Sequence, residues 1–251
     1  MSQPWNLTPQ QWSHVLLDNV NPEGIAKSLE RAAIRPWTDN LLKFTANSTT
    51  TLDLGSGTGQ PSAILGLAGK KTTLLDWSPD NLEFSRKLFE NLKIQGEFCR
   101  GDMLQPLPFK DNSFDTVFSC GVFEYFSDAE IQSILKEAFR VAKKNVIILV
   151  PNAWSLPYRI GKFYQEKTGA WEWGGERPFP SMKPYFQAVG CRKINEFSVA
   201  AKLSLDFLTM RGSGLLKKIL IRGLNLKTHT NPAKLKQGYL LITVGEKSRS
   251  S

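Results

Sequence analysis

The sequence has few of the residues on which disulfide-rich and metal-binding proteins depend. Its 251 residues include three cysteines and two histidines. Cys99, Cys120 and Cys191 form no C-x-x-C pair and have no histidine partner at ligand spacing. This scarcity argues against a disulfide framework, a structural zinc site and a thioredoxin-type site. We therefore expect no metal ion.

Long hydrophobic runs are lacking as well. No apolar stretch approaches the roughly 20 residues that span a bilayer, and residues 1–21 are too polar for a signal peptide, with tryptophans and prolines among them. The default expectation is therefore a cytoplasmic protein. A hydrophobic content of 41% over this length suits one α/β domain with a full core rather than two domains.

Acidic residues are scarce in the last fifth of the chain. The net charge is +9, and after Lys202 only Asp206 and Glu246 oppose a series of lysines and arginines. Summed positive charge attracts polyanions, but a solvated basic face is the commoner explanation of such a distribution. We expect no nucleic-acid partner.

A glycine-rich stretch follows a short apolar run. Gly55, Gly57 and Gly59 come directly after residues 52–54, and an apolar helical pattern begins at Ala63. This order predicts a strand, a tight turn and a helix. Glycines permit positive φ angles and close approach of a ligand, and a helix start offers unpaired N–H donors. Alone, the run is equally compatible with an ordinary strand-to-helix corner.

A carboxylate ends the next predicted strand. Residues 70–76 read as a strand that finishes at Asp76, and Ser78-Pro79 predicts the start of a helix that ends near residue 92. A carboxylate at this place suits the hydroxyls of a ribose. The alternative is that Asp76 helps to cap the helix, and we favour the ribose role.

The strand and helix alternation continues to residue 152. Further strands are predicted at 97–103, 116–120 and 145–150, and a helix is predicted at 128–142. The helix begins at Ser127, whose S-x-x-E pattern is a capping box. The alternation predicts a parallel, doubly wound sheet with its ligands at the carboxyl ends of the strands. Asp76, Asp102 and Gly121 fall at those ends, beside the glycine turn, and are expected to form one crevice.

These stretches together resemble the class I S-adenosylmethionine-dependent methyltransferases, in the group that acts on small molecules and lipids. The resemblance rests on LDLGSGTG at 52–59, LLDWSP at 74–79, GDMLQPLPFKDNSFDTVFSCGVFEYF at 101–126 and RVAKKNVIILVPN at 140–152. It implies an α/β, Rossmann-like sheet of seven strands in the order 3-2-1-4-5-7-6, with the last strand antiparallel and helices on both faces. The closing strands are expected at 191–199 and 237–244.

The resemblance also implies one methyltransferase domain over the whole chain. An N-terminal helical cap is expected at 1–47, with its last helix at 37–44. A cofactor-binding half follows at 48–152. Acceptor-side inserts after strands 5 and 6, with the closing strands, are expected at 153–251. The oligomeric state is left open.

The implied cofactor is S-adenosylmethionine, whose cationic sulfonium needs no metal. Its methionine end is expected near Asp53 and the glycine turn, its ribose at Asp76, and its adenine at Asp102 and Met103. Cys120 and Gly121 are expected near its methionyl carboxylate and sulfonium. The cofactor-binding candidates are thus Asp53, Gly55, Ser56, Gly57, Gly59, Asp76, Trp77, Asp102, Met103, Cys120 and Gly121.

Two inserts provide candidates for contact with the acceptor. Residues 153–190 are rich in aromatic side chains, which form the wall of an acceptor pocket or pack the insert onto the sheet. The candidates for substrate contact are Trp154, Tyr158, Trp171 and Trp173. In the second insert, residues 215–226 form a basic amphipathic pattern. Such a pattern predicts either peripheral membrane contact or a helix packed on the domain.

The function expected from these features is methyl transfer to a small-molecule or lipid-like acceptor, with oxygen favoured and nitrogen or carbon also open. Candidates for a base are Tyr125, Glu124 and His14. An RNA or protein methyltransferase and a non-catalytic cofactor-binding module stay open. A nicotinamide-dependent oxidoreductase is least favoured, because its G-x-G-x-x-G fingerprint needs a glycine where Gln60 stands.

Overall fold

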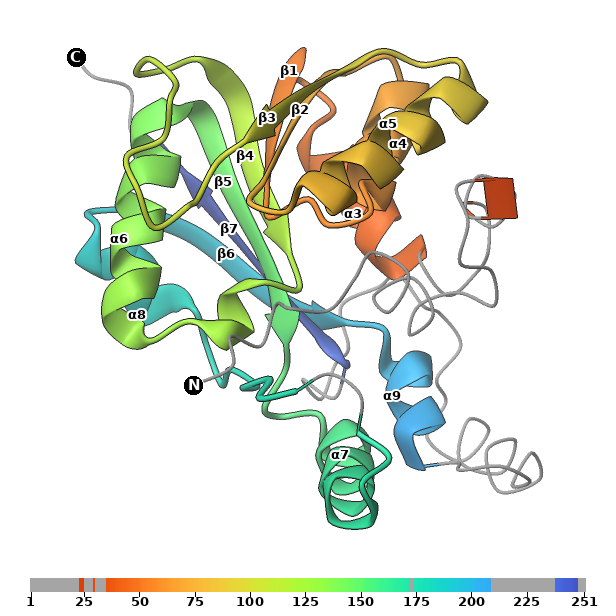
Figure 1. Ribbon diagram of the computed structural model, residues 1–251. Helices are drawn as coiled ribbons and strands as arrows, with labels where there is room; N and C mark the ends of the chain where they lie inside the picture. The colour runs from red at the N-terminus through yellow and green to blue at the C-terminus, as the bar shows by residue number, and fades with distance from the viewer. Residues whose placement is uncertain (1–22, 25–28, 30–34, 172–173, 209–237, 248–251) are drawn as a thin grey trace.

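The computed structural model describes residues 23–24, 29, 35–171, 174–208 and 238–247, and the account below is confined to them. Its elements, labelled as in Figure 1, are α3 (Arg35–Phe44), β1 (Thr50–Leu54), α4 (Gln60–Leu67), β2 (Lys71–Asp76), α5 (Pro79–Leu92), β3 (Gly96–Arg100), β4 (Phe114–Cys120), the 3-10 helix η1 (Phe123–Tyr125), α6 (Asp128–Val141), β5 (Ala142–Pro151), α7 (Leu156–Thr168), α8 (Lys183–Ala188), β6 (Lys193–Val199), α9 (Ala201–Leu208) and β7 (Leu240–Glu246).

The strands form one seven-stranded sheet in the order β3-β2-β1-β4-β5-β7-β6. Strands β1 to β5 pair in parallel, whereas β7 runs antiparallel to both β5 and β6. This is the order and direction that the sequence predicts. Because β1 to β5 are parallel, their carboxyl ends lie at one edge of the sheet, and the loops that follow them meet there.

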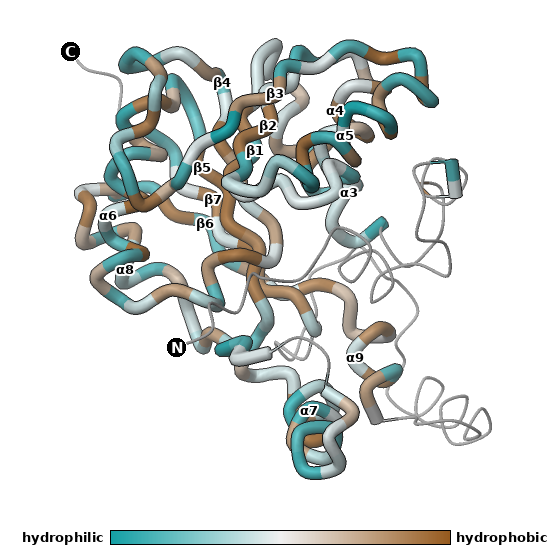
Figure 2. The backbone as a smooth tube through the Cα atoms, viewed as in Figure 1, coloured by the Kyte–Doolittle hydropathy of each residue, from teal (hydrophilic) through white to brown (hydrophobic). Residues whose placement is uncertain are grey.

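Helices cover both faces of the sheet. Helices α3, α4 and α5 lie on one side, and α6 and α8 lie on the other (Figure 1). The strands between them are apolar along most of their length (Figure 2). Alternate residues of a strand point toward the helices on opposite faces of the sheet. Leu74 belongs to the apolar cluster that contains Leu88 of α5, whereas Leu75 belongs to the cluster that contains Ile131 of α6. The sheet is therefore buried from both sides.

Helices α7 and α9 pack against each other beyond the carboxyl ends of the strands (Figure 1). Their close approach depends on Gly161 of α7, where an added Cβ would lie 2.3 Å from the carbonyl oxygen of Phe207 in α9. The ring of Tyr158 packs on Phe207 and Tyr239, with centroids 5.1 and 5.0 Å away. The two inserts thus join at the ligand edge of the sheet.

Several predicted boundaries differ from the observed ones. Strand β3 ends at Arg100, so Asp102 and Met103 lie in the loop that follows. Helix α6 ends at Val141, because Ala142 already has extended backbone angles, φ −77° and ψ 142°. Strand β5 starts at Ala142 rather than at residue 145, and β7 runs from 240 to 246.

Other predictions fall outside the described residues. Most of the N-terminal cap, including His14, lies there, as do Trp173 and the amphipathic segment 215–226. Helix α3 confirms the helix predicted at 37–44 and begins two residues earlier. The division into a cap, a cofactor half and an acceptor half stays a prediction. Among the described residues, no helix is both long and apolar enough to cross a membrane.

Candidate active site

A cavity of about 1030 Å³ opens at the carboxyl edge of the sheet. The loops after β1, β2, β3 and β4 line it, and α3, α7, α9 and the start of β7 contribute further residues. Ligand pockets in proteins span roughly 300 to 1,000 Å³, so this cavity is at the large end of that range. The described residues contain no group of three or more histidine, cysteine or acidic side chains that could hold a metal ion.

The glycine turn after β1 forms one wall of the cavity. Gly55, Gly57 and Gly59 have φ angles of 70°, 53° and 73°, a region that other residues enter at a cost. The backbone N–H groups of Gly55 and Ser56 donate to the carbonyl oxygen of Leu75, at 2.8 and 3.1 Å. The turn is therefore fixed to β2, and its Cβ-free backbone faces the cavity.

Asp76 at the end of β2 is fixed by hydrogen bonds to two parts of the chain. Its Oδ2 accepts from the Gly57 N–H at 2.8 Å, and its Oδ1 accepts from Ser78 N–H at 2.9 Å and Asn81 Nδ2 at 3.2 Å. Burial raises the pKa of the Asp76 carboxyl, while these hydrogen bonds oppose the rise. Asp76 thus organises both the glycine turn and the start of α5, and only the second of these roles was predicted, by the capping alternative.

Asp53 lies within β1 beneath the turn and is almost fully buried. Its Oδ2 accepts from the Ser62 hydroxyl at 2.9 Å. Burial raises its pKa to about 7, and the charge of Asp76 adds to the rise. A cationic ligand in the cavity would reverse part of that shift by stabilising the ionised carboxylate.

The loops after β3 and β4 complete the cavity. Asp102 accepts from the Leu104 N–H at 2.9 Å through Oδ1, and the buried Met103 lies beside it. After β4, Gly121 turns the chain with a φ of 70° toward Glu124 and Tyr125 in η1. Burial raises the pKa values of both the Glu124 carboxyl and the Tyr125 phenol.

Most of the predicted cofactor residues meet at this cavity. Those that line it are Asp53, Gly55, Ser56, Gly57, Asp76, Trp77, Asp102, Met103, Cys120 and Gly121. Gly59 is not among the lining residues and instead provides the N-cap of α4. Of the predicted bases, Glu124 and Tyr125 line the cavity. The role of each of these residues toward a ligand stays a prediction.

Three of the four aromatic candidates for substrate contact, Trp154, Tyr158 and Trp171, lie outside the lining of the cavity. Trp154 donates from Nε1 to the Pro180 carbonyl at 3.0 Å on the exposed surface, and the Trp171 Nε1 donates to Gly174. Tyr158 is fully buried and donates its hydroxyl to Glu176. Packing of the insert therefore accounts for these three side chains, and their contact with an acceptor stays a prediction.

Sequence reasoning missed several lining residues. Asn81 lies in the first turn of α5, five residues after Asp76, and this spacing is a signal that the sequence offers. Glu176 lies between α7 and α8, Phe207 in α9 and Tyr239 just before β7. No motif marks these three, because only the tertiary fold brings them to the edge of the sheet.

Comparisons with known proteins agree with this geometry. Residues 52–150 match the protein family described as a methyltransferase domain. The chain is 35% identical over 223 residues to the chloroplastic 2-methyl-6-phytyl-1,4-hydroquinone methyltransferase 2 of Oryza sativa subsp. japonica, covering 86% of this chain and 58% of that protein. It is 29% identical over 165 residues to a malonyl-[acyl-carrier protein] O-methyltransferase of Serratia marcescens, covering 61% of this chain and 62% of the relative. The chain thus spans about three fifths of the length of each relative.

Solved structures share the fold at low identity. A magnesium protoporphyrin IX methyltransferase of Synechocystis PCC 6803 with bound SAH superposes with a TM-score of 0.59 at 14% identity, over 95% of this chain and 93% of that one. An O-methyltransferase family protein of Burkholderia thailandensis gives 0.61 at 16% identity, over 98% and 65%. At such identities the likeness extends to the fold alone.

Proposed function

Since residues 52–150 place this chain among the class I S-adenosylmethionine-dependent methyltransferases, we propose that it transfers the methyl group of S-adenosylmethionine to a small-molecule or lipid-like acceptor. The observation that carries the proposal is the convergence on one cavity of the glycine turn, Asp76, Asp102 and the Cys120–Gly121 turn. An acceptor oxygen is favoured over nitrogen or carbon.

The polar atoms of the cavity fit a ribose. A carboxylate has about four acceptor sites, and Asp76 uses three of them on Gly57, Ser78 and Asn81. The backbone N–H of Trp77 also interacts with this carboxylate, so Asp76 has room for at most about one ligand hydroxyl. The buried Asn81 Oδ1, beside it, has no hydrogen-bond partner within the described structure. Asp76 and Asn81 together would accept from the two hydroxyls of a ribose, which neither would hold alone.

The remaining walls fit the other parts of the cofactor. The buried Ser56 Oγ in the glycine turn also has no partner among the described residues, and with Asp53 it would serve the methionine end. Asp102 and Met103 would hold the adenine. When bound, S-adenosylmethionine supplies an electrophilic methyl group, and attack by the acceptor's electron pair breaks the carbon–sulfur bond and leaves a neutral thioether. The chain contributes mainly by fixing both reactants in one cavity.

Calorimetric titration with S-adenosylmethionine, S-adenosylhomocysteine and NAD tests the proposal. We expect the first two to bind and NAD to show no heat. Asp76→Ala should weaken S-adenosylhomocysteine binding about 10- to 100-fold, the worth of a hydrogen bond to a charged group. Asp80→Ala, at an exposed carboxylate in the first turn of the same helix, is the matched control and should bind as wild type. Binding of NAD alone would refute the proposal.

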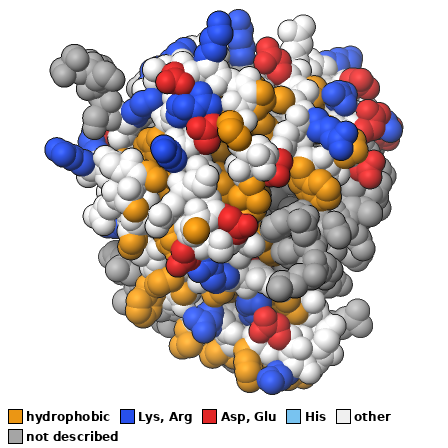
Figure 3. All heavy atoms as spheres, turned by 60° about the vertical axis from the view of Figure 1, so that its left-hand side comes forward, with side chains coloured by type: hydrophobic (Ala, Val, Ile, Leu, Met, Phe, Trp, Pro, Cys, Tyr) orange, Lys and Arg blue, Asp and Glu red, His pale blue; other side chains and the backbone are white. Residues whose placement is uncertain are grey.

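We also propose that the acceptor is amphiphilic and is reached at a membrane surface. Within the described residues, five of the seven exposed large hydrophobic side chains lie on or just before α7: Trp154, Leu156, Ile160, Phe163 and Tyr164. Hydrophobic side chains gather along the lower part of the face shown in Figure 3, at the height of α7 in Figure 1. The opposite face of α7 carries Tyr158 and Gly161, which are buried, and Gln165, which lines the cavity.

The charges beside this face suit an anionic lipid surface. Arg159 and Lys167 are exposed on α7, and the Lys167 Nζ lies 5.7 Å from the Phe163 ring centroid. Apolar side chains flanked by cations are the composition of interfacial helices. Because the other face of the same helix borders the cavity, an acceptor dissolved in the membrane would reach the site beside α7.

Co-sedimentation with vesicles tests the membrane contact. Wild type should bind phosphatidylglycerol vesicles more tightly than phosphatidylcholine vesicles, and added salt should weaken the binding. Replacing both Ile160 and Phe163 with Ser should lower the affinity at least about tenfold, since each loses its apolar burial. Leu67→Ser removes a similarly exposed side chain from α4 and should change nothing. Equal loss in both variants would contradict the assignment to α7.

A further inference from the structure

Two buried carboxyl groups lie beside the Cys120–Gly121 turn. Glu124 in η1 and Glu176, in the segment between α7 and α8, both line the cavity, with 4% and 5% of their surfaces exposed. Glu124 and Glu176 belong to segments that are far apart in the sequence, so only the fold brings them together. Buried carboxyl groups are rare unless they are paired or functional.

Arg177 holds the two segments together. Its backbone N–H donates to the Glu124 carbonyl at 3.1 Å, and its Nη2 donates to the Phe126 carbonyl at 3.1 Å. Its Nη1 pairs with Asp128 at 2.7 Å, and its guanidinium lies 4.6 Å from the Phe179 ring centroid. The residue after Glu176 is thereby tied to Glu124 itself and to the chain that follows η1. Arg177 acts as a positioning residue for the carboxyl pair.

One oxygen of the pair has no protein partner. Glu124 Oε2 is buried and has no hydrogen bond within the part of the chain that is described, while Oε1 lies against Gly121, 3.6 Å from the place of an added Cβ. Glu176 Oε1 accepts from the buried Tyr158 hydroxyl. Lys162 faces Glu176, but its ammonium is paired with Glu166. The pair is therefore rich in acceptors, and the cation near it is already shared.

We propose that Glu124 and Glu176 bind the reacting group of the acceptor, that this group is a neutral hydroxyl, and that Glu124 takes up its proton. This inference rests on the proposed function and deepens it. An unpartnered buried oxygen costs free energy unless a ligand donates to it, and a hydroxyl supplies that hydrogen bond. Two carboxyl groups repel an anionic group instead, so the pair selects against acceptors whose reacting group is a carboxylate.

The proton balance is simple. The O–H bond of the acceptor breaks as its oxygen bonds to the methyl carbon, and the proton passes to Glu124 Oε2, which becomes the neutral acid. Before the next turnover, Glu124 loses this proton to water. Glu124 takes up this proton readily, because burial and the charge of Glu176 both favour its neutral form.

The protonation behaviour of the pair supports this role. Burial raises the pKa of Glu124 well above its usual range, and the charge of Glu176 adds to that rise. Burial also raises the pKa of Glu176 to about 7, while the Tyr158 hydrogen bond and the charge of Lys162 oppose the rise. The ionisable groups that face the pair are Cys120, Tyr125, Tyr158, Lys162, Glu166 and Tyr239. The raised pKa makes Glu124 a stronger base than an exposed carboxylate.

Two matched probes test the inference on the protein loaded with S-adenosylhomocysteine. 4-Nonylphenol presents a neutral hydroxyl, and 4-nonylbenzoate presents a carboxylate on the same ring and tail. We expect wild type to bind the phenol at least about tenfold more tightly. Glu124→Gln and Glu176→Gln should each narrow that preference to below about threefold, since an amide no longer repels the anion. Equal binding of the two probes by wild type, or binding of neither, overturns the inference.

Turnover supplies a second readout. With a hydroxyl acceptor, Glu124→Gln should lower kcat about 100-fold, the usual contribution of a base, and Glu124→Asp should restore part of it. S-Adenosylhomocysteine affinity should stay within about threefold of wild type in both variants. Glu90→Gln, at an exposed glutamate of α5, is the control and should leave both readouts unchanged. An undiminished kcat in Glu124→Gln contradicts the proton-acceptor role.

The outcomes separate the inference from the proposed function. If wild type fails to bind S-adenosylmethionine and S-adenosylhomocysteine, the proposed function fails. If both bind and methyl transfer is seen, but Glu124→Gln keeps its kcat and the probe preference is unchanged, only the carboxyl pair is refuted. Gln is isosteric with Glu and removes a buried charge, so we expect both variants to fold. Thermal unfolding of each variant checks this directly.

Discussion

In the glycine turn after β1, Gly57 and Gly59 require glycine for different physical reasons. Both have positive φ angles, and a residue with a Cβ adopts this left-handed backbone conformation only at a cost in free energy. An added Cβ at Gly57 meets nothing within 4 Å, whereas at Gly59 it would lie 2.7 Å from the Ser85 Oγ and 2.9 Å from Leu74 Cδ2. Gly57 is therefore constrained by its backbone alone, and Gly59 by backbone and packing together.

This difference predicts unequal costs of substitution by alanine. Gly57→Ala should lower the free energy of unfolding by about 1–2 kcal/mol, the cost of the left-handed region. Gly59→Ala should lower it by about 2–4 kcal/mol, because overpacking adds to that cost. It would also displace Ser85, whose hydroxyl donates to the Gly57 carbonyl at 3.1 Å. Urea unfolding of both variants measures the difference, and equal costs would contradict the packing argument.

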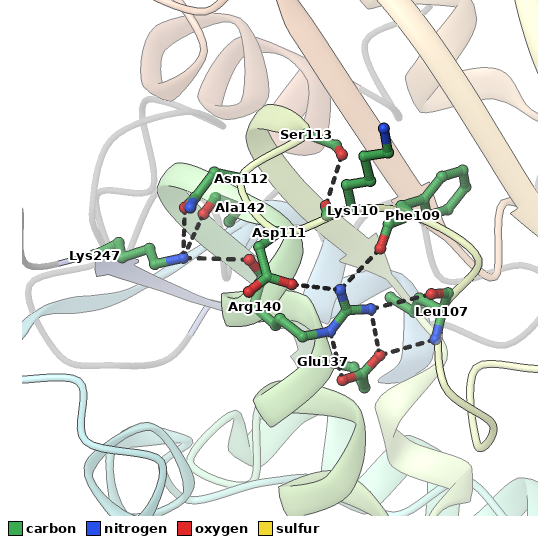
Figure 4. Close-up of polar contacts among 10 residues, drawn as sticks. All are labelled: Leu107, Phe109, Lys110, Asp111, Asn112, Ser113, Glu137, Arg140, Ala142 and Lys247. Carbon is green, nitrogen blue, oxygen red and sulfur yellow. Dashed lines mark hydrogen bonds and ion pairs between the residues drawn. The ribbon is translucent and has the colours of Figure 1, made fainter. Parts of the chain in front are cut away.

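At the level of elements, Arg140 near the end of α6 holds the loop between β3 and β4. Its guanidinium donates to Glu137, to Asp111, and to the carbonyl oxygens of Leu107 and Phe109, at 2.7 to 3.0 Å (Figure 4). Lys247, just after β7, donates to the Arg140 carbonyl at 3.3 Å. This network lies at the amino ends of β4 and β5, at the opposite edge of the sheet from the cavity.

Arg140→Ala should therefore destabilise the fold without altering the site. Loss of the guanidinium leaves two carbonyl groups and a partly buried carboxylate without their donor, so we expect a cost of about 1–3 kcal/mol in urea unfolding. Lys87→Ala removes an exposed pair with Glu83, 3.4 Å long, and should cost less than about 1 kcal/mol. S-Adenosylhomocysteine affinity should be unchanged in both. A weaker affinity in Arg140→Ala would contradict the separation of the two edges.

The elements that the sequence predicted well are those set by local chemistry. Ser127 and Glu130 form the predicted capping box, and Ser78 caps α5 through the Asn81 N–H. Positions at strand ends were predictable too, because parallel strands bring their carboxyl ends together whatever the loops contain. The positive φ of Gly121 and the hydrogen bonds of Asp76 follow from that same arrangement.

What the sequence could not predict depends on contacts between distant segments. Trp171 and Tyr158 carry the aromatic signal of a binding wall, yet the same signal describes rings that pack α7 onto α9. Glu176 has no local pattern, and its place beside Glu124 is set by Arg177 and by the pairing of Phe179 with Asn152. Motifs and hydrophobic periodicity therefore predict the residues on the cofactor side of the cavity but not those on the acceptor side.

For the whole molecule, the cavity determines how stability depends on pH. Burial raises the pKa of Asp53 and of Glu176 to about 7, and it raises those of Asp76 and Glu124 as well. A carboxyl whose pKa is higher in the folded state binds more protons there than in the unfolded chain. Between about pH 4 and pH 7 the free energy of unfolding should therefore fall as the pH rises.

Substitution of Asp53 by Asn tests this dependence at its most buried carboxyl. Asn is neutral at every pH, and its Oδ1 can still accept from the Ser62 hydroxyl that now donates to Asp53. The variant should gain about 1–3 kcal/mol at pH 8, where wild type must bury an ionised carboxylate, and should gain little at pH 4. Urea unfolding from pH 4 to pH 8 measures both slopes. If the free energy of unfolding varies with pH in parallel for the two proteins, Asp53 is not the group whose ionisation weakens the fold. A flatter pH dependence for Asp53→Asn would show that the cavity retains this carboxylate at the expense of stability, as a site for a cationic ligand does.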